Sequence, residues 1–372
     1  MRNRVDALIL LLAFGRTVPF WSWLAPTAAW LAFFALGARS DETGIALLLA
    51  VLLMPTVLAA VHHAEVIAVK AGEPFGTLIL ALAVTIIECA LIVTLMLAKP
   101  EATTALLRDT VYSAVMIILG GVVGLCIAVG AARHQVQRFS LYGVSAATTA
   151  LAALAVLVLV LPNFTTSTVG GTFSEGQLLL VGAASLAIWC LFVFVQTIAH
   201  RDYFLPEDVT GDGIPDRQSC TSMQAALALV LLIICLSAVV LLAKTLSDPL
   251  GAAIVASGAP LAAVGVVIAG VVLLPEGMAA VRAARANRLQ TSLNLALGSA
   301  LATIGLTVPV IVGLSLAFGW KLELGLDPKG ITLLALMLLV SSMSLSTGRT
   351  TVLQGAVHLV IFAFFLFTSF TP

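Results

Sequence analysis

The sequence predicts an all-α polytopic membrane protein with about eleven transmembrane helices, one N-terminal helix followed by two inverted five-helix repeats. The first observation is composition: apolar residues make up 61% of the 372 residues, charged residues only 10%, and the mean hydropathy is +1.14. A soluble domain carries about 25% charged residues. The second is the recurrence of long apolar runs, since a helix needs roughly 20 apolar residues to cross about 30 Å of hydrocarbon. The third is an acid in corresponding runs of the two halves.

The apolar runs between polar breaks predict the spans in order. They cover residues 18–37, 44–61, 76–98, 111–130, 141–161, 177–199, 223–243, 252–275, 291–317, 331–346 and 351–370. The opening segment, MRNRVDALILLLAFGR, has a positive start but an apolar core of only ten residues. It lacks a small-residue cleavage site, so we interpret it as a cytoplasmic or interfacial segment and not as a signal peptide.

Lys and Arg residues indicate the orientation, because they are enriched in cytoplasmic loops. With the N-terminus in the cytoplasm, twelve of the 18 Lys and Arg residues lie inside and six outside. The six outside are Arg39, Lys99, Arg108, Lys244, Lys321 and Lys329. This bias predicts a cytoplasmic N-terminus and a C-terminus on the outside.

Two stretches resemble each other at an offset of 181 residues: RDTVYSAVMIILGGVVGL from Arg108 and LQTSLNLALGSALATIGL from Leu289. An acid-bearing span precedes each stretch. Without the first span, ten remain, and a five-helix unit repeated in tandem enters the membrane in the opposite orientation. Such inverted repeats are typical of secondary transporters, whose ion sites lie near the midplane. The predicted parts are residues 1–43 (N-terminal segment and first helix), 44–199 (first repeat), 200–222 (acidic cytoplasmic loop) and 223–372 (second repeat).

The two intramembrane acids are Glu88 in GTLILALAVTIIECALIVTLMLA and Glu276 in GVVIAGVVLLPEGMAAV. An ionisable group at the bilayer centre costs roughly 2.5–3.5 kcal/mol on insertion scales. Burial disfavours the charged form of a carboxyl group, whereas a bound cation favours it. Such a group can exchange a proton for a cation, so Glu88 and Glu276 are the predicted cation- and proton-binding residues. The alternative is that each acid only hydrogen-bonds a neighbouring helix.

Further residues are candidates to line the site. Pro275 frees a backbone carbonyl beside Glu276, although a simple kink is the alternative. Asp109 and Ser113 share a helix face, as do Gln290, Asn294 and Gly298, and Ser299 lies next to that face. Helix capping is an equal alternative for Asp109 and Gln290, and close helix packing is the alternative for Gly298.

Histidine and glutamine side chains supply weaker candidates. Gln354 and His358 are four residues apart and could relay protons, but helix–helix hydrogen bonding explains them equally well. His63, with His62 and Glu65, ends the second span, where an interfacial position is expected.

The sequence lacks the motifs that indicate several other functions. The five cysteines contain no CxxC, so neither a zinc site nor a disulfide framework is indicated. The loop RDYFLPEDVTGDGIPDR fails the EF-hand spacing and is expected to be a solvated linker, with a weak cation sensor as the alternative. No G-x-x-x-x-G-K-[ST] motif supports ATP-driven transport. We expect no enzyme activity, no cofactor and no nucleic-acid partner; the expected partners are membrane lipids and transported ions.

Five motifs carry a resemblance to a known family. HHAEVIAVKAGEPFGTLILALAVTIIE, RDTVYS, LLPEG, NLALGSALATIGLTVP and STGRTTVLQGAVHL resemble the ChaA-type bacterial cation/proton antiporters of the calcium/cation antiporter superfamily. The resemblance runs from about residue 55 to the C-terminus. It implies eleven spans in the bacterial inner membrane, two inverted repeats, and export of Ca²⁺, and of Na⁺ or K⁺, in exchange for H⁺.

The resemblance also assigns residues. The conserved acid of each repeat maps onto Glu88 and Glu276, and the asparagine-containing helix onto Asn294. Many relatives carry Gly-Asn shortly before each acid, where this chain has Val84-Thr85 and Val272-Leu273. Thr85 keeps a side-chain oxygen and Leu273 does not, which leaves open a Na⁺(K⁺)/H⁺ antiporter with little Ca²⁺ activity. A cation channel is the remaining alternative.

Overall fold

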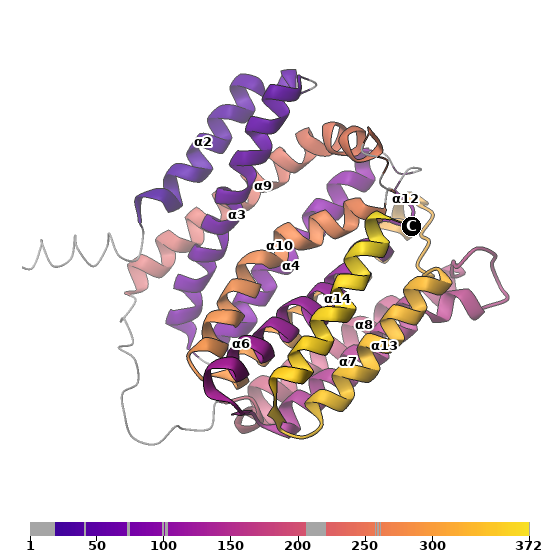
Figure 1. The fold of residues 1–372 in the computed structure, drawn as a ribbon. Helices are drawn as coiled ribbons and strands as arrows, with labels where there is room; N and C mark the ends of the chain where they lie inside the picture. The colour runs from indigo at the N-terminus through magenta and orange to yellow at the C-terminus, as the bar shows by residue number, and fades with distance from the viewer. Residues whose placement is uncertain are drawn as a thin grey trace, which may run out of the picture. The chain divides into compact units, whose positions relative to one another are not determined.

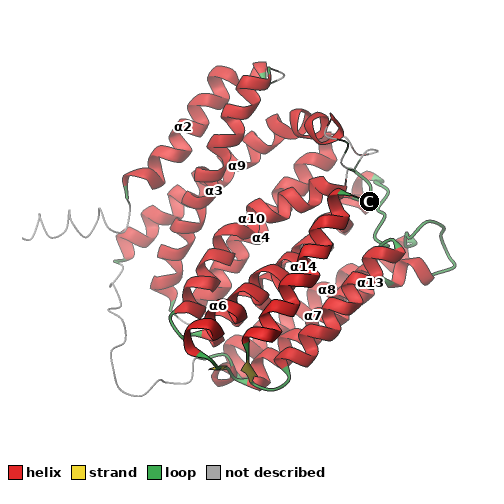
Figure 2. Ribbon diagram, in the orientation of Figure 1, coloured by secondary structure: helices red, strands yellow, loops and turns green. Residues whose placement is uncertain are grey.

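In a computed structural model of the protein, the described residues are 19–371, except 41, 73–74, 99, 101–102, 206–220, 257, 259 and 261. The opening segment and most of the acidic loop predicted at 200–222 therefore lie outside the described residues. The chain divides into two compact units, Met1–Ala83 with Thr210–Leu250, and Val84–Val209 with Gly251–Pro372. The described elements are almost all helices (Figure 2).

Within the described residues, eleven helical segments are long and apolar enough to cross a membrane, as predicted. They are Phe20–Arg39, Thr43–Ala71, Leu78–Leu97, Leu106–His134, Leu141–Leu159, Glu175–Ala199, Ser222–Leu246, Ala263–Arg285, Leu289–Phe318, Pro328–Leu345 and Val352–Phe370. The prediction of an all-α membrane protein with about eleven spans is confirmed.

The second span is longer than predicted, and His63 lies inside its helix and not at its end. The interfacial position expected for His63 stays a prediction. Helix α3 (Thr43–Ala71) continues ten residues beyond the predicted end at residue 61. His63 is fully buried, and its Nε2 lies 3.1 Å from the carbonyl oxygen of Ser22. A polar side chain that finds a partner inside the protein does not have to end a span.

The eighth span begins later than predicted. Helix α9 (Ser222–Ala256) continues through Pro249, and helix α10 (Ala262–Arg285) starts only after Pro260. Gly258, with a positive φ of 75°, and Pro260 break the apolar run that was assigned to one span at 252–275. As a result, Pro275 and Glu276 lie inside α10 and not at its end.

The first unit is a small helical bundle. Helix α2 (Phe20–Leu36), α3 and the first part of α9 lie side by side in Figure 1. Their buried contacts include Ala29, Leu49, Ala238 and Leu242. Helices α4 (Phe75–Ala98) and α9 each contribute residues to both units.

The second unit contains the two acid-bearing segments and most of the remaining helices. Its elements are α5 (Leu106–Met116), η3 (Ile117–Val123), α6 (Gly124–His134), β1 (Gln137–Arg138), α7 (Leu141–Leu159), η4 (Leu161–Phe164), α8 (Glu175–Phe194), η5 (Val195–Ala199), η6 (Arg201–Tyr203), α10, α11 (Leu289–Ala302), η7 (Thr303–Thr307), α12 (Val308–Phe318), α13 (Pro328–Leu345), β2 (Arg349–Thr350) and α14 (Val352–Phe370). Strands β1 and β2 pair antiparallel, with Gln137 opposite Thr350.

The long spans at 106–134 and 289–318 share an irregularity. Each contains a π-helical segment near its middle, η3 in the first and η7 in the second. Gly120 of η3 packs against Phe362 of α14, and Gly305 of η7 packs against Trp189 of α8. Short π-helical segments are rare and occur frequently at functional sites.

Candidate cation-binding site

The two intramembrane acids are both buried in the second unit. Glu88 of α4 is 0% exposed and Glu276 of α10 is 3% exposed. Thr303 donates its hydroxyl to Oε2 of Glu88 at 2.7 Å, and Ser299 donates its hydroxyl to Oε2 of Glu276. Because Ser299 and Thr303 are four residues apart on one helical span, their Cβ atoms are about 5–6 Å apart. Both carboxyl groups therefore approach two consecutive turns of the same span.

Each carboxyl group has one oxygen left over. Oε1 of Glu88 and Oε1 of Glu276 are buried and have no hydrogen-bond partner among the described residues. Burying an ionised carboxylate is costly unless its charge is paired, so a proton or a cation at each Oε1 would stabilise the group. The predicted acid pair thus forms one polar centre inside an apolar helix bundle.

The two spans that carry Glu276 and Thr303 have backbone irregularities next to these residues in sequence. Pro275 lies inside α10 directly before Glu276. Because proline lacks an N–H, the carbonyl of Val271, four residues earlier, loses its helical donor. Thr303 is the first residue of the π-helical segment η7, where the regular hydrogen-bond ladder is also interrupted.

Thr85 and Pro275 are close to the acids in sequence, and Ser299 contacts Glu276 directly. Thr85 is buried in α4, three residues before Glu88. Gly298 faces open space, because an added Cβ would meet nothing within 4 Å. The close-packing explanation for Gly298 is therefore wrong.

Asn294 and Gln290 hydrogen-bond the chain around them. Gln290 donates to Oδ1 of Asn294 at 2.8 Å, and Asn294 donates to the carbonyl of Phe204. The amide oxygen of Gln290 accepts from the backbone N–H of Ser140 at 2.7 Å. These contacts tie α11 to the segments before α7 and after η6. The lining role assigned to both residues stays a prediction.

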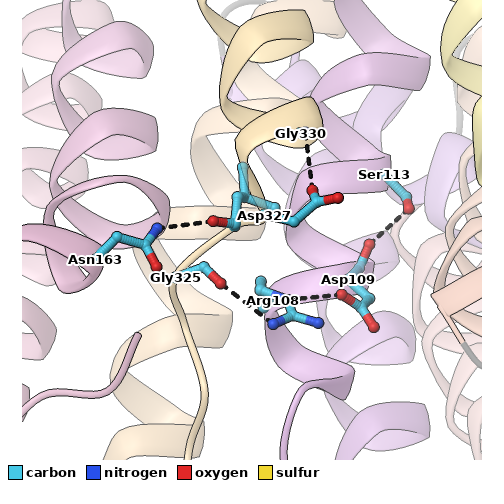
Figure 3. A network of polar contacts seen from close by, with 8 residues as sticks. Arg108, Asp109, Ser113, Asn163, Gly325, Asp327 and Gly330 are labelled. Carbon is cyan, nitrogen blue, oxygen red and sulfur yellow. Dashed lines mark hydrogen bonds and ion pairs between the residues drawn. The ribbon is translucent and has the colours of Figure 1, made fainter. Parts of the chain in front are cut away.

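Asp109 and Ser113 lie in a different polar network (Figure 3). Arg108 donates to Oδ1 of Asp109 at 2.8 Å and to the carbonyl of Gly325 at 3.2 Å. The Ser113 hydroxyl donates to the backbone carbonyl of Asp109. The backbone of Asp109 packs on Gly265 of α10, eleven residues before Glu276. That separation is about 16 Å along a helix, too far for Asp109 and Glu276 to share one ion.

The histidine and glutamine candidates bind neighbouring helices. Nδ1 of His358 lies 2.7 Å from the carbonyl of Leu119 in η3, and its Nε2 lies 2.8 Å from the Ser344 hydroxyl. Gln354 donates to the carbonyl of Ser344 in α13 at 3.4 Å and accepts from the backbone N–H of Thr351 at 2.8 Å at the start of α14. His63 belongs to the first compact unit. His358 thus joins α14 to the π-helical segment.

The sequence interpretation missed Thr303. The sequence pattern predicts Ser299 from its place beside the Asn294 face, but the Thr303 hydroxyl, one turn further, is identified only by the structure. The available signal was the spacing of Ser299 and Thr303 in LGSALATIG, because residues four apart share one helix face.

We expect loss of either hydroxyl donor to impair the site. A hydrogen bond to a charged group contributes about 1.5–3 kcal/mol, so Thr303→Val and Ser299→Ala should each weaken cation affinity by roughly 10-fold or more. The measurement is the half-saturating cation concentration for exchange in proteoliposomes. Thr332→Val, at an exposed hydroxyl of α13, is the matched control. Unchanged half-saturation in both site variants would contradict the assigned contacts.

The chain matches the model of the sodium/calcium exchanger protein family over residues 42–198 and 227–371. The chain belongs to this family. It is 49% identical over 358 residues to a Sinorhizobium fredii protein that is named only as an ionic transporter, y4hA, covering 95% of this chain and 97% of that protein. It is 36% identical over 354 residues to the sodium-potassium/proton antiporter ChaA of Escherichia coli, covering 94% of this chain and 96% of ChaA.

A solved structure of this fold is also similar. The Ca²⁺/H⁺ antiporter YfkE aligns with a TM-score of 0.69 at 17% identity, covering 92% of this chain and 100% of YfkE. This likeness confirms the predicted all-α fold with inverted repeats. As a member of the exchanger family, the protein is a multi-pass membrane antiporter for cations and not an enzyme. The resemblance stated from the sequence motifs is therefore confirmed.

Proposed function

We propose that this exchanger moves Ca²⁺, and Na⁺ or K⁺, across the membrane in exchange for H⁺ by alternating access. Glu88 and Glu276 hold either the cation or protons. The observation that carries the proposal is the pair of buried carboxyl oxygens, one on each glutamate, without a partner among the described residues. One polar centre of this kind accommodates a cation or protons, but not both together.

The same chemistry explains why transport in one direction requires transport in the other. Two ionised carboxylates in a low-dielectric interior are strongly unfavourable when neither cation nor proton neutralises them. The empty, doubly charged site therefore resists the conformational change that would carry it across the membrane. With a cation or with protons bound, that barrier is removed. Obligatory exchange follows.

Oxygen count bears on the choice of cation. Glu88, Glu276, Ser299 and Thr303 supply at most four carboxylate and two hydroxyl oxygens. Calcium takes six to eight oxygen ligands, so water or a backbone carbonyl such as that of Val271 would complete its shell. The described residues contain no group of three or more His, Cys, Asp or Glu side chains arranged for a metal ion.

A monovalent exchanger is the second candidate. Val84 and Leu273, shortly before the two acids, offer no side-chain oxygen. The Escherichia coli relative is named a sodium-potassium/proton antiporter and matches almost the whole chain. Both observations support this second candidate, in which Na⁺ or K⁺ is the main substrate and Ca²⁺ activity is low.

The membrane placement completes the proposal. We place the protein in the bacterial inner membrane with its N-terminus in the cytoplasm and its C-terminus outside, on the twelve-to-six distribution of Lys and Arg. The repeats are proposed at residues 44–199 and 223–372.

A flux experiment on the purified full-length protein distinguishes the candidates. In proteoliposomes with a preformed pH gradient, adding Ca²⁺, Na⁺ or K⁺ should dissipate the gradient for each transported cation. Dissipation by Na⁺ or K⁺ alone would favour the monovalent exchanger. Cation current without proton movement would contradict exchange and indicate a channel.

A further inference from the structure

The second unit has a groove beside the acid-bearing helix α10. This groove of about 640 Å³ runs between α10 on one side and η3, α6 and α14 on the other. Its walls are apolar and include Gly121, Val122, Leu274, Met278 and Phe362. Leu274 and Met278 are 44% and 42% exposed, although they belong to a membrane-spanning helix. The groove is therefore open at the surface of the unit.

Three glycine residues line the groove. An added Cβ at Gly270 would meet nothing within 4 Å, and one at Gly277 would meet only Val122. Both glycines line the groove, and so does Gly121 on the opposite wall. The open position at Gly270 extends the groove along α10, whereas Gly277 and Gly121 let the two walls pack closely on Val122 and Phe362.

The length of the groove matches one leaflet of a bilayer. Twelve residues separate Gly270 from Arg282, which corresponds to about 18 Å along α10. Half of a hydrocarbon core of about 30 Å is about 15 Å. A groove that starts at the end of a span and extends inward by this distance accommodates one acyl chain.

Two arginines lie at the end of the groove that is formed by the last turn of α10. Arg282 and Arg285 line it and are exposed in the last turn of α10. Nε of Arg282 donates to the carbonyl of Met278 on its own helix at 3.3 Å. Neither guanidinium forms an ion pair with a carboxylate in the part of the chain that the structure describes. Their charges are therefore available to an anion from outside the protein.

We propose that this groove binds an anionic phospholipid. The acyl chain lies along the glycine-lined wall, and the phosphate is held by Arg282 and Arg285. Arginine binds phosphate oxygens through paired N–H donors, and basic pockets at the ends of membrane helices favour anionic headgroups. The bound chain contacts Leu273 and Gly277, on the turns that flank Glu276. The ligand is distinct from the transported ions.

Lipid titration of the purified full-length protein tests this site. In neutral detergent, phosphatidylglycerol should raise the thermal unfolding temperature at lower concentrations than phosphatidylcholine does. Each basic residue near a membrane surface contributes about fivefold in affinity for anionic lipid. Arg282→Gln with Arg285→Gln should therefore shift the phosphatidylglycerol midpoint by roughly 25-fold. Gly270→Leu, which fills the groove, should weaken binding of both lipids.

Matched controls separate this site from general surface charge. Arg288→Gln removes an exposed arginine that does not line the groove, and should leave the midpoint unchanged. Gly313→Leu adds the same side chain at another open helix position and should leave lipid binding unchanged. Equal stabilisation by both lipids, the same stabilisation by inorganic phosphate, or an equal effect of Arg288→Gln would overturn the proposal. So would a change of oligomeric mass in Gly270→Leu, which would indicate that a second copy covers the groove.

Discussion

Replacing Glu276 with glutamine is expected to abolish coupled exchange while leaving the protein folded. Glutamine keeps the shape of the side chain and still accepts the hydroxyl of Ser299, but it carries neither a negative charge nor an exchangeable carboxyl proton. Losing one partner of a buried charged contact costs about 3–5 kcal/mol, which corresponds to a fall in transport on the order of 10²-fold or more. Glu88→Gln should behave in the same way, since Glu88 has the equivalent contact with Thr303.

The measurement is proton flux driven by each cation in proteoliposomes that contain equal amounts of folded protein. Glu175→Gln is the control, because Glu175 is an exposed acid in the first turn of α8. Its exchange rate should equal that of the unaltered protein. Retained exchange in either Glu88→Gln or Glu276→Gln would refute the roles assigned to the acids. If only one variant lost exchange, the paired role would be refuted and the carboxyl group replaced in that variant would be the one that binds cation and proton.

Replacing Gly305 with alanine is expected to displace the span that carries Ser299 and Thr303, because Gly305 packs against α8. An added Cβ would collide with the Cβ and ring of Trp189 on α8. Neither atom belongs to a flexible side-chain end, so the helices would have to separate. Overpacking of this kind costs typically about 1–3 kcal/mol. Gly305 lies two residues after Thr303 in η7, so the displacement should also weaken the contact with Glu88.

Thermal unfolding and exchange rate should therefore both fall in Gly305→Ala. Gly313→Ala is the matched control on the same span, because its Cβ would meet nothing within 4 Å. If Gly305→Ala matches Gly313→Ala in both measurements, the close packing of η7 on α8 does not support the site. The comparison is free of helix-propensity effects, since both changes replace glycine by alanine in a helical span.

Sequence patterns predicted the spans well where an apolar run had clear polar breaks. The errors arose where tertiary contacts changed the meaning of a polar or breaking residue. His63 lies inside α3, where its Nε2 is 3.1 Å from the carbonyl oxygen of Ser22. Pro249 lies inside α9, whereas Gly258 and Pro260 separate α9 from α10. A single sequence does not distinguish a proline that a helix tolerates from one that ends it, because the difference depends on the neighbouring helices.

The candidate site shows the same division. Burying Glu88 and Glu276 in hydrocarbon is so costly that their positions in the sequence alone predict a functional role for them. The sequence could not identify Thr303 as the partner of Glu88. It also could not show that Asp109 pairs with Arg108, in a network separate from the two acids. Those outcomes depend on which faces of α4, α10 and α11 meet.

By itself, the sequence predicted a membrane protein, the number of spans, the family and two acids within spans. It could do so because the length of an apolar run and the cost of burying a charge are local properties of the chain. Only the tertiary structure decided which hydroxyls reach the acids, which oxygens remain without partners and where an open groove lies beside α10. Hydrogen bonds and close glycine contacts act over about 3–4 Å. Glu88 and Thr303 are 215 positions apart in the chain, and such residues meet at that range only after the helices have packed.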